Sequence, residues 1–123
     1  MKKILLAFII LFALKGYSQN ADDIIGKWLK TNKEDLTIEV YKLKNEYHGK
    51  ISRSADKRKP VGFVMLENLK FNLKTKKWEE GVIHDPNSNR SYNATARLKS
   101  DNTLEVIGAM LFFKSKRTFK KIK

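Results

Sequence analysis

One stretch of the chain gathers the side-chain types that catalysis uses. Residues 81–92 read GVIHDPNSNRSY, with His84 beside Asp85 and with hydroxyls at Ser88 and Ser91. A base, an orienting carboxylate and a nucleophile form a hydrolytic triad only when they are in hydrogen-bond contact. His84 and Asp85 are neighbours on an expected strand end, where consecutive side chains point to opposite faces. The spacing therefore disfavours a triad, and we expect no catalytic residues.

Turn chemistry explains the same stretch better. Asp85 can accept hydrogen bonds from nearby backbone amides, and Pro86 fixes φ at the first corner of a turn. Asn87 and Asn89 tolerate the left-handed region that a tight connection needs. We therefore interpret these residues as a connection between two strands.

His84 stands where the first of these strands ends. If Trp78 and Val82 set the inward register of that strand, His84 points inward as well. At the mouth of a barrel it could bind a ligand carboxylate or respond to pH. A histidine that is simply hydrogen-bonded to its neighbours is the alternative.

The sequence offers few residues for metal binding, acid–base catalysis or phosphate binding. The chain has two histidines and no cysteine, and its sequence shows no oxygen-rich calcium loop, so we predict no metal site. Glu79 and Glu80 are adjacent on one expected strand and should diverge, which makes them a poor acid–base pair. The sequence has no glycine-rich phosphate loop, and we expect no cofactor. A hydrolase is thus the least favoured class, and we predict that the protein is not an enzyme.

The N-terminus has the layout of a secretory signal peptide. A positively charged start precedes an uninterrupted run of eleven apolar residues, 4–14, and small residues then permit cleavage after Ser18. Such a run spans about 16 Å as a helix, roughly half of a bilayer core, which argues against a transmembrane anchor. We expect residues 1–18 to be removed and residues 19–123 to form one exported domain, either periplasmic or secreted.

The chain is strongly basic. It has 26 Lys and Arg against 13 Asp and Glu, and without residues 1–18 it would keep 23 basic and 13 acidic side chains, a formal charge of +10. This charge favours an anionic partner, namely anionic lipid or an envelope polyanion, unless the lysines serve only solubility. Nucleic acid is disfavoured, because its binding surfaces interleave cations with exposed aromatics, whereas the aromatics here fall mostly on inward registers.

Alternation of apolar and polar residues with a period of two runs through most of the chain. One short helical turn is possible near residues 22–26. Eight regularly spaced strands predict an all-β fold, an antiparallel up-and-down barrel that closes on itself. The predicted strands cover residues 26–31, 35–44, 46–53, 61–71, 77–84, 91–99, 103–112 and 115–122.

One predicted strand departs from clean alternation. Its inward row would be Val61, Phe63, Met65, Leu69 and Phe71. Because other residues of this strand are apolar too, it is either covered on both faces or bulged near residues 67–68.

An eight-stranded barrel is just wide enough to be filled by side chains or to hold one small ligand. Small residues on inward registers, such as Gly49 and Gly108, either leave room or let larger neighbours fill the space. With room left, the ligand would be small and apolar or amphipathic. A filled barrel would act instead through its basic exterior, on envelope polyanions or a protein partner. The expected lining of a ligand cavity is Trp28, Tyr47, Phe63, Met65, Tyr92 and Met110, with Arg117 and His84 as polar anchors.

The first and last strands of a closed meander are neighbours. Trp28 near the start of the first and Arg117 on the last can therefore stack, with the guanidinium over the indole, a contact worth about 0.5–2 kcal/mol. Gly26 would let the entering backbone pass close beneath.

These positions are similar to known patterns. Gly26 and Trp28 on the first strand with Arg117 on the last resemble the lipocalin-like, or calycin, pattern. Together with residues 47–51, 81–86, 104–108 and 117–119, they resemble DUF2147, a family of small exported bacterial proteins known only as a domain of unknown function. The resemblance covers about residues 22–122, implies a lipocalin-like barrel and carries no established activity. Its structural signature here is Gly26, Trp28, Gly49, Asp85, Pro86 and Arg117.

Overall fold

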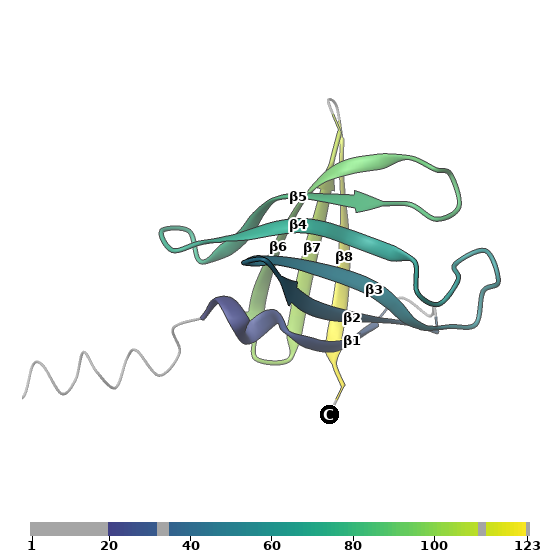
Figure 1. Cartoon of the computed structure of the whole chain (residues 1–123), viewed down its shortest axis with the longest axis horizontal. Helices are drawn as coiled ribbons and strands as arrows, with labels where there is room; N and C mark the ends of the chain where they lie inside the picture. The colour runs from purple at the N-terminus through teal and green to yellow at the C-terminus, as the bar shows by residue number, and fades with distance from the viewer. Residues whose placement is uncertain (1–19, 32–34, 111–112, 123) are drawn as a thin grey trace, which may run out of the picture.

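The computed structural model describes residues 20–31, 35–110 and 113–122 (Figure 1). The predicted signal peptide, residues 1–18, and Phe112 of the predicted seventh strand lie outside the described residues. A short 3-10 turn, Ala21–Ile24, precedes eight strands. No helix in these ranges is long and apolar enough to cross a membrane. The strands are β1 Gly26–Lys30, β2 Leu36–Leu43, β3 Glu46–Ser54, β4 Val64–Asn72, β5 Lys77–His84, β6 Ser91–Ser100, β7 Thr103–Ala109 and β8 Lys114–Lys121.

The eight strands form a closed barrel. Each strand pairs antiparallel with the next, and β1 pairs with β8 through Trp28 opposite Lys121. Closure leaves no unpaired sheet edge. The predicted all-β, eight-stranded up-and-down barrel is confirmed, and every strand begins and ends within three residues of its predicted range.

Strand direction defines two ends of the barrel. The connections after β3, β5 and β7 lie at one end, which we call the open end. In Figure 1 the first two of these extend to the right, while the β7–β8 hairpin projects at the top. The 3-10 turn and the connections after β2, β4 and β6 lie at the other end, the closed end.

Three aromatic side chains hold the 3-10 turn across the closed end. All three are buried, and each donates its polar hydrogen to the turn, which satisfies a group that would otherwise be costly to bury. Burial and the hydrogen bond to Asp22 raise the pKa of Tyr47, so this phenol stays protonated. The bonds run from Trp28 Nε1 to the Ile24 carbonyl at 3.0 Å, from Trp78 Nε1 to the Ala21 carbonyl at 2.9 Å, and from the Tyr47 hydroxyl to Asp22 Oδ1 at 2.5 Å.

A bulge interrupts β4. Asn68 has φ of +62°, and β4 there carries one residue more than β3 opposite it. Of the two alternatives for this strand, the structure shows the bulge near residues 67–68. The Asn68 amide donates to His48 Nδ1 at 3.2 Å, and the His48 ring stacks on Tyr41. His48 is buried because the bulge and Tyr41 cover it.

A second bulge, in β5, reverses which of its alternate side chains point inward. Glu80 has φ of +60°, and one extra residue separates Trp78 from Gly81 relative to β6. Trp78 and Ile83 are consequently both buried in the core. The neighbour of Ile83, His84, then points away from the interior, so the predicted inward position of His84 is wrong.

Two other residues of the predicted inward rows are exposed. β7 ends at Ala109, and the Met110 amide donates to the Phe113 carbonyl at 2.9 Å in the following turn. Met110 is 43% exposed. Val61 precedes the start of β4 and is 65% exposed. Both residues lie beyond the end of their strand, where alternation no longer determines which face a side chain occupies.

Candidate functional site

Inward glycines show how closely the barrel is packed. A Cβ on Gly81 would lie 2.5 Å from a Leu69 methyl, and one on Gly108 would lie 3.1 Å from Ile83. A Cβ on Gly49 would meet the side chain across from it on β4 at 3.3 Å. Of the two alternatives for these small residues, this supports the one in which larger neighbours fill the space.

The predicted lining residues do not surround one cavity. Trp28 and Tyr47 are fully buried and bonded to the 3-10 turn at the closed end. Phe63 and Tyr92 are partly buried and pack against the core. Met110 is exposed on the surface, whereas Met65, His84 and Arg117 line one hollow at the open end.

Two adjoining hollows open at this end, and we call them together the open-end trough. The larger has a volume of about 770 Å³ and the smaller about 220 Å³. They share Leu36, Lys59 and Asn87. The larger is also lined by Asp35, Ser54, Ala55, Asp56, Lys57 and Arg58, and the smaller by Lys30, Met65, His84, Asp85, Pro86 and Arg117.

The trough combines apolar and cationic surface. Leu36 and Met65 are buried side chains that reach its lining from the barrel core. Five cations and three carboxylates line the rest, and two of the carboxylates are already paired. Asp56 accepts both hydrogen bonds of the Arg58 fork, at 3.1 and 3.2 Å, and Asp35 lies 3.4 Å from Arg53. The trough therefore keeps an excess of positive charge.

Asp85 is both a turn residue and the acidic neighbour of Arg117. Its Oδ1 accepts from the Asn87 amide at 2.9 Å, and Asn89 adopts φ of +60°, as the predicted turn requires. Burial raises the pKa of Asp85, but hydrogen bonds from Asn87 and Ser88 and the charge of Arg117 outweigh burial, so this pKa lies below its ordinary value. An ionised Asp85 and Arg117 thus face each other at one side of the trough.

The cation over the Trp28 ring is Lys121, and the predicted stack with Arg117 is wrong. Lys121 Nζ lies 4.9 Å from the ring centroid and donates to the Ile25 carbonyl at 3.1 Å. Arg117 is four residues earlier on β8, opposite Val106, nearer the open end. Gly26 does serve a close approach, since a Cβ there would lie 3.0 Å from Lys121 Nζ.

His84 connects a serine of β6 with a glutamate of β4. Its Nδ1 lies 2.7 Å from Ser91 Oγ, and its Nε2 lies 2.6 Å from Glu67 Oε1. A carboxylate, an imidazole and a hydroxyl in this order have the connectivity of a hydrolytic triad. Glu67 escaped prediction because it is 17 residues away and comes close only through the pairing of β4 with β5.

The surroundings of this trio favour a structural role. Ser91 is exposed and lies on a strand paired with β5, so nearby backbone amides serve the sheet ladder. Acyl transfer needs donors aimed at the developing oxyanion. The two hydrogen bonds tie β4, β5 and β6 together on the outer face. Among the described residues, no three His, Cys, Asp or Glu side chains gather closely enough to hold a metal ion.

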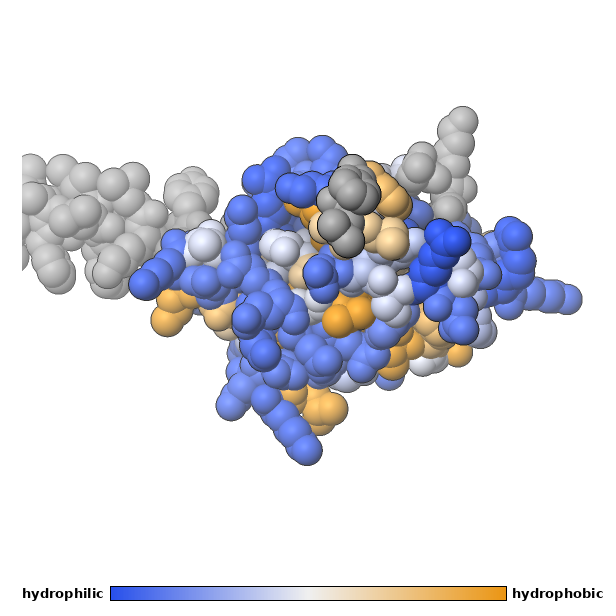
Figure 2. Space-filling view, turned by 90° about the horizontal axis from the view of Figure 1, so that it is seen from above, coloured by the Kyte–Doolittle hydropathy of each residue, from blue (hydrophilic) through white to orange (hydrophobic). Residues whose placement is uncertain are grey.

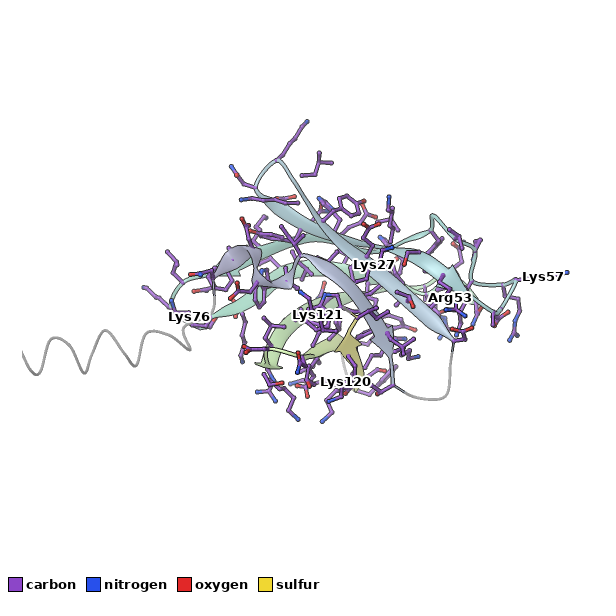
Figure 3. The ribbon with its side chains drawn as sticks, turned by 90° about the horizontal axis from the view of Figure 1, so that it is seen from below. Lys27, Arg53, Lys57, Lys76, Lys120 and Lys121 are labelled. Atoms are coloured by element: carbon purple, nitrogen blue, oxygen red, sulfur yellow. The ribbon has the colours of Figure 1, made fainter. Side chains whose placement is uncertain are left out.

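Basic side chains are spread around the barrel. Figure 3 shows Lys76 at one end, Lys57 at the other and Lys27 between them. These three cations therefore do not gather on one face, as expected of a surface rich in lysine. The outer face of β6–β8 differs, because its cations surround one buried acid.

That acid is Glu105, whose side chain is only 2% exposed. Arg97 Nε donates to its Oε1 at 2.8 Å, and the Nζ atoms of Lys99 and Lys116 lie 3.8 and 3.7 Å from its Oε2. Burial raises the pKa of Glu105, but the Arg97 hydrogen bond and the charges of the three cations outweigh it. The pKa therefore lies below its ordinary value, and the carboxylate stays charged.

Comparisons with known proteins agree with this architecture. Residues 26–121 match the model of a family described as an uncharacterized protein conserved in bacteria, DUF2147. Among solved structures, protein HP1028 from Helicobacter pylori, described as belonging to the lipocalin family, is similar with a TM-score of 0.65 and 11% identity, over 81% of this chain and 83% of that chain. At this identity the likeness concerns the fold alone. No curated protein matches. The chain therefore belongs to the DUF2147 family and adopts a lipocalin-like barrel.

Proposed function

We propose that the protein binds a small amphipathic anion in the open-end trough. One observation carries this proposal: the barrel interior is packed with side chains, whereas the open end is hollow and cationic. An apolar tail would lie against Leu36 and Met65. The anionic group would lie near Lys59 and Arg117.

The size and chemistry of the trough support this ligand class. Ligand pockets commonly measure roughly 300–1,000 Å³ and combine apolar walls with a few placed polar groups. The larger hollow, at about 770 Å³, falls within that range. The guanidinium of Arg117 offers the planar donor geometry that carboxylates and phosphates accept. Asp85 beside it would orient this side chain.

We also propose that the protein acts after export, in the periplasm or outside the cell. The apolar run and small residues before position 19 support this location. Amphipathic anions such as fatty acids and lipid fragments arise at cell envelopes, which is compatible with both proposals.

Calorimetric titration tests the ligand class. Decanoate and decyl phosphate serve as probes, with decanol as the neutral counterpart. We expect the two anions to bind and decanol to bind at least about tenfold more weakly, since an anion gains charge-assisted hydrogen bonds. Arg117→Gln should weaken decanoate binding, whereas Lys76→Gln at the closed end, which removes one equal charge, should not. Equal binding of decanol, or equal losses in both variants, would refute the proposal.

A further inference from the structure

The β7–β8 hairpin exposes apolar side chains at its end. Met110 is 43% and Phe113 57% exposed. Met110 also borders a shallow surface hollow of about 290 Å³ that includes Val82, Tyr92 and Ala109. Ser91 and Asn93 line this hollow too, so a partly apolar surface continues from the hairpin onto β5 and β6. Figure 2, seen from above, shows hydrophobic side chains near the centre of a mostly hydrophilic face.

Basic residues follow this apolar end of the hairpin, on the side toward the barrel. Lys114 follows Phe113, is exposed, and pairs with Ala109 in the β7–β8 register. Lys116 is two residues further along the same face, and Arg90 is exposed where the connection after β5 reaches β6. With a rise of about 3.3 Å per strand residue, Lys114 and Lys116 lie roughly 3 and 10 Å behind Phe113. We call Met110, Phe113 and Lys114 the hairpin tip.

We infer that the hairpin tip docks on an anionic lipid bilayer. Interfacial segments bury an apolar face about 5–10 Å into the boundary between headgroups and acyl chains, and their basic residues remain at headgroup level. With Met110 and Phe113 at that depth, Lys114 and Lys116 would lie among the headgroups. Each basic residue near an anionic surface raises partitioning by a factor of roughly five.

The shape and charge of this region favour a bilayer over other partners. The adjoining ends of β7 and β8 lie beyond the neighbouring strands in Figure 1, so they suit a fluid surface that closes around them. Single-stranded nucleic acid would instead need a basic groove with stacked aromatic platforms. This inference depends on the hairpin alone and does not depend on ligand binding in the trough.

The closed end supplies a matched control. Leu73 is 73% exposed and is followed by Lys74 in the β4–β5 turn, so it also combines an apolar with a basic side chain. Leu73 has no second exposed apolar residue beside it in its turn, whereas the hairpin tip has two and adjoins a partly apolar hollow. We therefore expect Leu73 to contribute little to docking.

Vesicle co-sedimentation of the mature protein tests the inference. The vesicles contain phosphatidylcholine alone or with roughly one third phosphatidylglycerol, at low and at high salt. We expect binding to the anionic vesicles that weakens as salt rises, because the exposed charges are screened. Met110→Ser with Phe113→Ser should reduce this binding at least about tenfold. Leu73→Ser with Lys74→Gln should leave it unchanged.

Thermal melting establishes that each variant is folded, and Phe113→Ser alone replaces the double variant if that one melts below the assay temperature. Absence of binding to the anionic vesicles overturns the inference, as does equal binding to phosphatidylcholine alone. So does an equal loss in the closed-end variant, which would show that any exposed apolar turn suffices.

Discussion

At the scale of single residues, buried charge is the most consequential feature. Glu105 is almost completely buried on the outer face of β6–β8, where the cationic nitrogens of Arg97, Lys99 and Lys116 lie 2.8, 3.8 and 3.7 Å from its carboxylate oxygens. The carboxylate and its cations therefore act as one unit, and removing the acid affects all of them.

Glu105→Gln should lower the free energy of unfolding near pH 7 by about 1–3 kcal/mol, because the charged hydrogen bond and ion pairs are lost. The folded pKa of Glu105 lies below its ordinary value of 4.5. Its contribution is therefore complete above that ordinary value and disappears as the pH falls through the folded pKa. Urea unfolding of both proteins across this range should show the difference shrinking in acid. A difference that stays constant with pH would contradict the assignment.

Ser91 is expected to be unreactive despite its hydrogen bond with His84. The serine is exposed at the start of a strand that pairs with β5, and acyl transfer also needs donors aimed at the developing oxyanion. Incubation with a fluorophosphonate probe, followed by peptide mapping, should leave Ser91 unlabelled. Stoichiometric labelling that His84→Gln abolishes would instead establish a nucleophile and would require a hydrolytic function.

At the scale of elements, alternation and turn residues predict the strands, but they do not predict bulges. The eight strands and the turn at residues 85–90 follow from patterns that each strand carries by itself. The extra residue at Glu80 reverses the inward phase of β5, and its cause lies in pairing with β6. The pattern of β5 alone therefore does not give the orientation of His84 or its contact with Glu67. The partner of Trp28 was also misjudged, since register across β1 and β8 decides between Lys121 and Arg117.

Close packing inside the barrel predicts that substituting an inward glycine by alanine destabilises the fold more where the new methyl has less room. Gly81→Ala should destabilise the fold by about 1–3 kcal/mol, because the new methyl would lie 2.5 Å from Leu69 and 3.0 Å from the Glu67 carbonyl. Gly49→Ala should cost less, since its Cβ would meet Leu66 at 3.3 Å. Thermal or urea unfolding of the two variants shows which of them is less stable. Two variants as stable as the parent would mean that the interior has spare room.

At the scale of the whole molecule, the barrel is closed, packed at its centre and open at one end. Aromatic hydrogen bonds secure the 3-10 turn at the closed end, while the trough occupies the other. The predicted fold is thus confirmed. The predicted ligand cavity lay inside the barrel, whereas the trough lies at its open end. Leu36 and Lys59, which line it, were not predicted, because only strand order brings them together.

The proposed export predicts a defined mature N-terminus. Intact-mass measurement of the protein from its native host should give a chain that begins at Gln19, because small residues precede that position. A chain of full length that remains with the cytoplasmic fraction would contradict both the cleavage and the location.

Binding at the open end of a packed barrel is the central claim, and an NMR titration with decanoate tests it most directly. We predict saturable shifts of the Leu36 and Met65 methyl signals and of the Asn87 amide, with the indole N–H signals of Trp28 and Trp78 unmoved. Shifts centred on the two indoles, with the trough signals unchanged, would contradict it and would place the ligand inside the barrel.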